Sequence, residues 1–104
     1  MLDKTKVREI AEKYAEEVKK ILKPTAIVLF GSYVNGNPHK WSDIDIAVIM
    51  RNFQGDWLET ATELVGLSWN ISFDIEPHLL DESCDKSGFV AHVLKTGEYI
   101  YKVV

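Results

Sequence analysis

The chain has 104 residues, of which 46% are hydrophobic and 27% are charged, and its formal net charge at pH 7 is -4. This length predicts a single domain that covers residues 1–104. An acidic chain lacks the cationic surface that tight, non-specific binding to a nucleic-acid backbone needs. Nucleic acid is therefore not the expected partner.

No apolar run approaches the roughly 20 residues that span a bilayer, and the polar N-terminus shows no signal peptide. The single cysteine, Cys84, has no partner for an internal disulfide, which is compatible with a reducing cytoplasm. We therefore expect a cytoplasmic protein that does not enter a membrane.

The first half of the chain predicts two helices and two strands. Apolar residues recur at helical spacing, with Glu and Lys between them, which predicts an amphipathic helix over Asp3–Leu22. The continuous apolar run Thr25–Phe30 is typical of a buried strand, and Ser32–Asn35 can form one helical turn. A second strand is predicted over Asp43–Met50.

The middle of the second half predicts a helix and a strand. Apolar residues at helical spacing follow Asp56, which is suited to be the N-cap of this second amphipathic helix. Apolar and polar residues then alternate over Ile71–Ile75, which predicts a third strand that stops at Pro77. Leu79–Asp85 is expected to be a loop.

The C-terminal part predicts a short helix and an edge strand. The helix covers Phe89–Leu94 and is closed by Gly97, and the edge strand covers Tyr99–Val103. The order of elements implies a mixed β-sheet flanked by helices, an α/β (α+β) fold.

Two short motifs between the first two strands are the most informative feature of the chain. Gly31-Ser32 follows the first apolar run, and Asp43-Ile44-Asp45 starts the second, with ten residues between the motifs. Carboxylates one residue apart on a strand point to the same side, with Cα atoms roughly 6.5–7 Å apart, and both can bind divalent cations. A Gly-Ser turn offers backbone N–H groups to phosphate oxygens. Together the motifs predict a metal-nucleotide site.

This pattern resembles the minimal nucleotidyltransferase (MNT) family of the DNA polymerase β-like nucleotidyltransferase superfamily. The family motif is Gly-Ser, about ten residues and Asp-X-Asp, and the chain matches this spacing without a gap. The similarity extends from the leading helix to the C-terminal segment Phe89–Tyr101. It implies a DNA polymerase β-like fold in one minimal nucleotidyltransferase domain.

The resemblance also implies the reaction, which is attack on the α-phosphorus of a nucleoside triphosphate, usually ATP, with pyrophosphate leaving. Two Mg²⁺ ions held by carboxylates would neutralise the phosphates and activate the attacking oxygen. Asp43 and Asp45 are the expected metal ligands, and Gly31 and Ser32 are expected to contact the triphosphate. Hard oxygen ligands suit Mg²⁺, and the lack of a Cys or His cluster argues against zinc.

A third carboxylate is expected on a neighbouring strand, as a ligand of the catalytic metal. We select Asp74, because it lies in the alternating segment Ile71–Ile75 with apolar neighbours. Glu76 points to the same side of that strand and is the alternative.

Simpler structural explanations compete with these assignments. Asp43, Asp45 and Asp74 can be solvated positions on half-exposed strands, and Ser32 can be an ordinary helix N-cap. Lys40 can screen the triphosphate or be a solvated loop lysine.

Other chemically active residues are expected to have no catalytic role. The three histidines lack ligand-like spacing and are expected at surface or interface positions, and Cys84 is expected to be inert. Trp41 stands beside the metal pair and is the aromatic residue best placed to meet a nucleotide or a partner. The histidines are His39, His78 and His92.

The chain is too short to include the helical domain with which larger relatives of the superfamily close over the nucleotide. The resemblance therefore implies a partner, a small all-helical HEPN-type toxin that the nucleotidyltransferase neutralises as its antitoxin, by attaching AMP to a tyrosine. Two alternatives are a binding module that inhibits its partner by occlusion alone and an aminoglycoside-type transferase for small hydroxyl compounds. The intact motifs favour retained chemistry, and the missing acceptor domain disfavours the small-molecule transferase. Self-association through Tyr99–Val103 or the N-terminal helix is a further expectation that the sequence leaves open.

Overall fold

The computed structural model describes residues 3–36 and 43–103, and the predicted positions Lys40, Trp41 and His39 lie outside this range. In chain order the elements are α1 (Lys4–Ile21), β1 (Ala26–Phe30), α2 (Ser32–Asn35), β2 (Ile44–Met50), α3 (Trp57–Trp69), β3 (Ile75–Asp81), α4 (Phe89–Thr96) and β4 (Glu98–Lys102). The strands form one sheet in the order β3-β2-β1-β4. β1 pairs antiparallel with β2 and β4, whereas β2 and β3 run parallel, so the predicted mixed sheet is confirmed.

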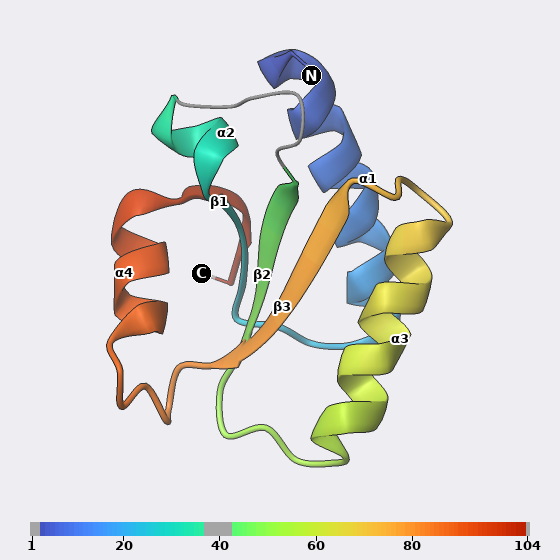
Figure 1. The fold of residues 1–104 in the computed structure, drawn as a ribbon. Coiled ribbons are helices and arrows are strands. Elements are labelled where there is room, and N and C mark those ends of the chain that lie inside the picture. Colours follow the sequence, from blue (N-terminus) through green and yellow to red (C-terminus); the bar gives the residue numbers. More distant parts are fainter. Residues whose placement is uncertain (1–2, 37–42, 104) are drawn as a thin grey trace.

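Helices cover both faces of the sheet (Figure 1). On one face, α1 and α3 pack on a core that includes Val7, Tyr14, Ile27, Ile46 and Leu64. On the other face, α4 packs on a smaller core that Ala26, Val28, Ala47, Ile49, Val90 and Val93 form. The short helix α2 lies at one end of the sheet, beyond the C-terminal end of β1. No helix in the described part of the chain has the length and apolar character needed to cross a bilayer.

The helix α1 forms where its apolar periodicity predicts it. Asp3 caps the N-terminus, since its carboxylate accepts a hydrogen bond of 2.8 Å from the Lys6 backbone N–H. The buried Tyr14 hydroxyl donates a hydrogen bond of 2.8 Å to the Leu64 carbonyl, which joins α1 to α3. Burial raises the pKa of Tyr14 well above its usual range, so the phenol remains a neutral donor.

The third strand lies later in the chain than the sequence predicts. β3 covers Ile75–Asp81, so it includes Pro77 and part of the segment that was expected to be a loop. The residues before it form a turn that closes α3, in which the Ser72 N–H donates to the Ser68 carbonyl at 2.8 Å. A proline is tolerated because β3 is an edge strand, paired on one side only. The expectation that the strand stops at Pro77 is therefore wrong.

The last helix and the last strand confirm their predictions. α4 ends at Gly97, whose N–H donates to the Val93 carbonyl at 2.7 Å, and β4 forms the other edge of the sheet beside β1. A Cβ at Gly97 would overlap the Val28 side chain and lie 2.9 Å from the Leu29 carbonyl oxygen. Only glycine lets the chain turn this close to the central strand.

Candidate active site

The turn after β1 places Gly31 against an acidic side chain of β2. Gly31 has φ 86° and ψ -153°, a backbone conformation that is essentially restricted to glycine. A Cβ at this position would collide with the Asp45 Oδ2 atom. Glycine is therefore required for two reasons, its own backbone conformation and the close approach of Asp45.

Ser32 follows as the first residue of α2 and is half-buried. The turn is closed by backbone hydrogen bonds, in which Val34 N–H donates to the Gly31 carbonyl at 3.1 Å and Gly36 N–H donates to the Ser32 carbonyl. The Gly-Ser turn thus lies at the same end of the sheet as the start of β2. Contact of Ser32 with a triphosphate stays a prediction.

Three carboxylates meet at this end of the sheet. Asp45 lies on β2 and is paired with Phe30 on β1 and with Glu76 on β3. Asp43 precedes β2, is exposed, and shares a side-chain hydrogen bond with Glu76. The parallel register of β2 and β3 therefore brings Glu76 beside both aspartates of the motif.

The electrostatics of Glu76 reflect this crowding. Partial desolvation and the neighbouring Asp45 carboxylate raise the pKa of Glu76, the hydrogen bond with Asp43 adds to the rise, and His78 opposes it. Carboxylates close enough to disfavour each other's ionisation are stabilised by a bound cation.

Asp74, our choice for the third carboxylate, lies in the turn before β3. Its backbone N–H donates to Ser72 Oγ at 3.1 Å, and its carbonyl accepts a hydrogen bond of 2.7 Å from the Ile44 N–H. Its side chain is exposed. The backbone of Asp74 thus ties the start of β2 to the turn, and the residue that the sheet register aligns with Asp45 is Glu76.

His78 is a site residue that the sequence analysis missed. Its Nε2 atom lies 3.2 Å from Asp45 Oδ1, and its ring makes an edge contact with Phe30 at a centroid distance of 5.0 Å. Alternation along β3 places Glu76 and His78 on one face, but this signal was hidden because the predicted strand stopped at Pro77.

The residues present fit a divalent cation. One potential ligand atom each from Asp45, Glu76 and His78 lies within 4.8 Å of the other two. Carboxylate oxygens are the ligands that Mg²⁺ and Mn²⁺ prefer, and imidazole nitrogen is a ligand for first-row transition metals. The donor set therefore suits a metal-assisted reaction of a phosphate compound.

Two exposed aromatic side chains lie near this end of the sheet. Trp69 ends α3 with 60% of its surface exposed, and Phe73, which precedes Asp74, is 82% exposed. Their ring centroids are 6.5 Å apart. Exposed aromatic pairs of this kind are typical of surfaces that contact another molecule.

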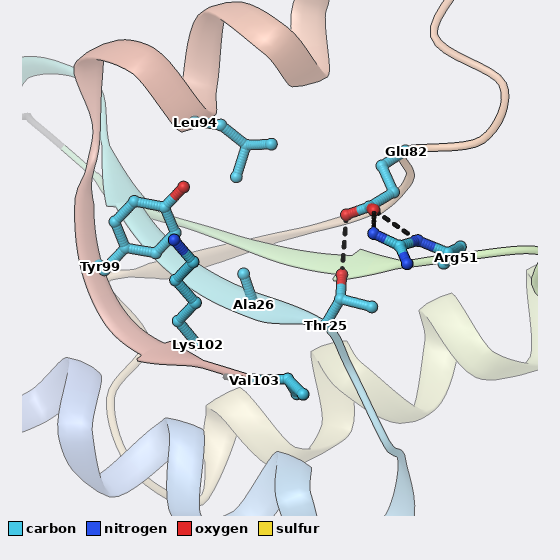
Figure 2. Close-up of a pocket in the computed structure, with 8 residues that line it drawn as sticks. All are labelled: Thr25, Ala26, Arg51, Glu82, Leu94, Tyr99, Lys102 and Val103. Atoms are coloured by element: carbon cyan, nitrogen blue, oxygen red, sulfur yellow. Dashed lines mark hydrogen bonds and ion pairs between the residues drawn. The ribbon is translucent and has the colours of Figure 1, made fainter.

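A separate cavity of about 410 Å³ lies at the opposite end of β1 (Figure 2). Glu82 is central to one side of it: it accepts hydrogen bonds from Thr25 Oγ1 at 2.9 Å and Arg51 Nε at 2.7 Å. These contacts join the ends of three strands. The cavity contains none of the residues of the acidic cluster. We place the candidate active site at the cluster and not at the cavity, because the cluster brings together side chains that can hold a metal ion.

Comparison with known families identifies the family of the chain. The model of the family described as polymerase beta nucleotidyltransferase matches residues 6–103. A curated relative from Methanocaldococcus jannaschii, "Putative protein adenylyltransferase MJ1215", is 41% identical over 44 residues, which are 42% of this chain and 51% of the relative. The match thus spans about half the length of that relative.

Solved structures share the fold. A Sulfolobus solfataricus protein described as a "putative nucleotidyltransferase" superimposes with a TM-score of 0.70 at 22% identity, over 95% of this chain and 83% of that chain. A toxin-antitoxin structure with AMP-PNP has a TM-score of 0.59 at 27% identity, over 88% and 73% of the two chains. The toxin-antitoxin MntA-HpeT has a TM-score of 0.54 at 25% identity, over 98% and 75%. The crystallised form of MntA-HpeT is a mutant in which two aspartates two positions apart are replaced by glutamate.

Proposed function

Because this chain belongs to the polymerase beta nucleotidyltransferase family, we propose that it transfers a nucleoside monophosphate, AMP from ATP, to a hydroxyl group of a partner protein. The observation that carries the proposal is the convergence of Asp43, Asp45 and Glu76 beside the Gly31-Ser32 turn. Three carboxylates next to a turn rich in backbone N–H groups are suited to a metal-bound triphosphate.

The proposed reaction is a substitution at the α-phosphorus. The acceptor oxygen forms a bond to this phosphorus, the bond to the bridging oxygen of the β-phosphate breaks, and pyrophosphate leaves. The proton of the hydroxyl group passes to a carboxylate oxygen of the cluster. We assign Gly31 and Ser32 to the triphosphate, since their turn faces Asp45 across a contact that admits no side chain.

The metal ligands are assigned by position in the sheet. Asp43 and Asp45 keep the role that the sequence predicts, and Glu76 takes the third position in place of Asp74, because Glu76 is the register partner of Asp45. Two divalent cations at this site would neutralise the phosphate charge and lower the pKa of the attacking hydroxyl. Carboxylates on two adjacent strands hold their positions through the backbone ladder, which supports precise geometry.

A partner protein is the proposed acceptor. Two structural relatives were crystallised as toxin-antitoxin systems, one of them with a nucleotide analogue, AMP-PNP. The exposed pair Trp69 and Phe73, at the C-terminal end of α3 and in the turn that follows, offers an apolar contact surface. We propose that the partner is a HEPN-type helical toxin and that this chain is its antitoxin.

The test is intact mass spectrometry of the helical partner, co-expressed with this chain. A gain of one AMP per partner molecule is expected with the wild-type chain and is expected to be absent with Asp43→Asn/Asp45→Asn. The matched control is Asp56→Asn, which removes one carboxylate charge at the other end of α3 and keeps a side-chain oxygen that can cap the helix. Transfer that persists in the double variant would refute the catalytic assignment.

The second candidate function is inhibition of the partner by occlusion alone, because binding through Trp69 and Phe73 does not require the chemistry of the acidic residues. Replacing Phe73 by serine is expected to weaken capture of the partner, since 82% of this ring is exposed and little of the fold depends on it. If the partner co-purifies tightly without any mass change, occlusion is the function. If Phe73→Ser binds and labels the partner like the wild type, the contact surface lies elsewhere.

A further inference from the structure

We propose that His78 is a metal ligand and that Asp45, Glu76 and His78 form a mixed carboxylate–imidazole site which prefers Mn²⁺ to Mg²⁺. This inference deepens the proposed function, on which its biological role rests, because it identifies the ion at the same site. Metal binding is measurable without nucleotide or acceptor, so it can be tested apart from group transfer.

The distances between the ligand atoms carry the inference. Ligand atoms about 2.1 Å from a common ion are roughly 3 Å apart when adjacent and roughly 4.2 Å apart when opposite. His78 Nε2 and Asp45 Oδ1 are 3.2 Å apart, which matches adjacent positions. All three ligand atoms lie within 4.8 Å of one another, so small side-chain adjustments complete the geometry.

The sheet explains why these three side chains meet. Asp45 and Glu76 are register partners on parallel strands, and His78 follows Glu76 on the same face of β3. The register partner of His78 is Ala47, whose methyl group occupies little space. The imidazole can therefore lie diagonally across the strands and reach Asp45.

Aromatic neighbours hold the imidazole ring in this orientation. The Phe30 ring contacts the His78 ring edge-on at a centroid distance of 5.0 Å, and Phe89 supports Phe30 at 5.8 Å. The His78 side chain is 29% exposed and the Asp45 side chain 22%, so a bound ion would retain access to water and substrate. A ligand fixed before the ion arrives loses less conformational entropy on binding.

The chemistry of the donor set decides the choice of ion. Mg²⁺ is best served by oxygen ligands, whereas an imidazole nitrogen favours first-row transition metals. Mn²⁺ accepts carboxylate and water oxygens as well as nitrogen, so it suits this set and the octahedral surroundings of a triphosphate. Cys84 is exposed and is not among the described residues that gather at the cluster, so no thiolate directs the site toward zinc.

The test is a Mn²⁺ titration of the full chain, followed by the EPR signal of the free ion, with Mg²⁺ as the competitor. Wild-type protein and the control variant His92→Ala, an exposed histidine on α4, are expected to bind Mn²⁺ equally well. His78→Ala is expected to lose about tenfold or more in Mn²⁺ affinity. Its affinity for Mg²⁺ is expected to change much less.

A second measurement separates ligation from support of Asp45. Pulsed EPR of bound Mn²⁺ should show a nitrogen coupling in the wild type that is absent in His78→Gln, a variant that keeps a hydrogen-bond donor near Asp45. A wild-type spectrum without this coupling, or Mn²⁺ affinities that His78→Gln and His78→Ala leave unchanged, would overturn the inference. Partner labelling that fails while Mn²⁺ binds as described would count against the proposed function only.

Discussion

Replacing Gly31 by alanine tests the contact between the glycine turn and Asp45. The backbone at Gly31, with φ 86° and ψ -153°, costs a side-chain-bearing residue about 1–3 kcal/mol. The added Cβ would also collide with Asp45 Oδ2 and force this carboxylate off its preferred rotamer, at about 0.5–1.5 kcal/mol. The free energy of unfolding should therefore fall by roughly 2–4 kcal/mol, and the displaced Asp45 should no longer bind metal with Glu76.

Gly36→Ala is the matched control for this variant. Gly36 also has a positive φ, 81°, but a Cβ there would meet no atom within 4 Å. It should cost about 1–2 kcal/mol from the backbone alone and leave metal binding intact. Urea unfolding and Mn²⁺ titration of both variants supply the comparison. Equal stability of the two variants, together with wild-type Mn²⁺ affinity in Gly31→Ala, would refute the proposed contact.

Three further predictions concern the site and the fold. Glu76→Gln should lower the rate of partner labelling about a thousandfold, because several kcal/mol of metal-assisted stabilisation are lost, whereas Asp74→Asn should change this rate little. If a labelling time course shows the larger loss for Asp74→Asn, the third metal ligand is Asp74. Gly97→Ala should lower the free energy of unfolding, measured in urea, by about 1–3 kcal/mol, because the added Cβ overlaps β1. The Cβ added by Gly66→Ala in α3 meets no atom within 4 Å, so this variant should raise the free energy of unfolding by up to about 1 kcal/mol. Hydrogen bonds from Ser83 and from the turn after β2 lower the pKa of Asp81 to about 2. The contribution of Asp81 to stability is therefore present above its ordinary pKa and is lost as the pH falls from about 4 to 2. If Asp81→Asn loses as much stability as the wild type over this pH range, this prediction is wrong.

Elements with a local signal could be predicted from the sequence. The apolar periodicity of α1 and α3, together with Asp56 as the predicted N-cap of α3, specifies both helices without tertiary information. The buried strand β1 is a continuous apolar run, and β2 contains one over residues 46–50. The Gly-Ser and Asp-X-Asp motifs beside these runs identify the family. In each case the physical cause lies within a few residues of the feature it determines.

The third strand and the last members of the site depended on tertiary structure. Alternation over Ile71–Ile75 suggested a strand, but this segment closes α3 through its hydrogen bonds to Ser68. From the sequence, Pro77 is expected to end a strand, and only the edge position of β3 explains why the strand continues through it. Only then do Glu76 and His78 appear on one face of β3.

The sequence by itself determined the helices, the two central strands and the aspartate pair, since these follow from local periodicity and spacing. Tertiary structure decided which acidic residue joins that pair and brought His78 to Asp45, because parallel pairing joins residues more than 30 positions apart, as in Asp45 and Glu76. Such a register depends on the packing of whole strands and helices, and no short segment of the chain encodes it.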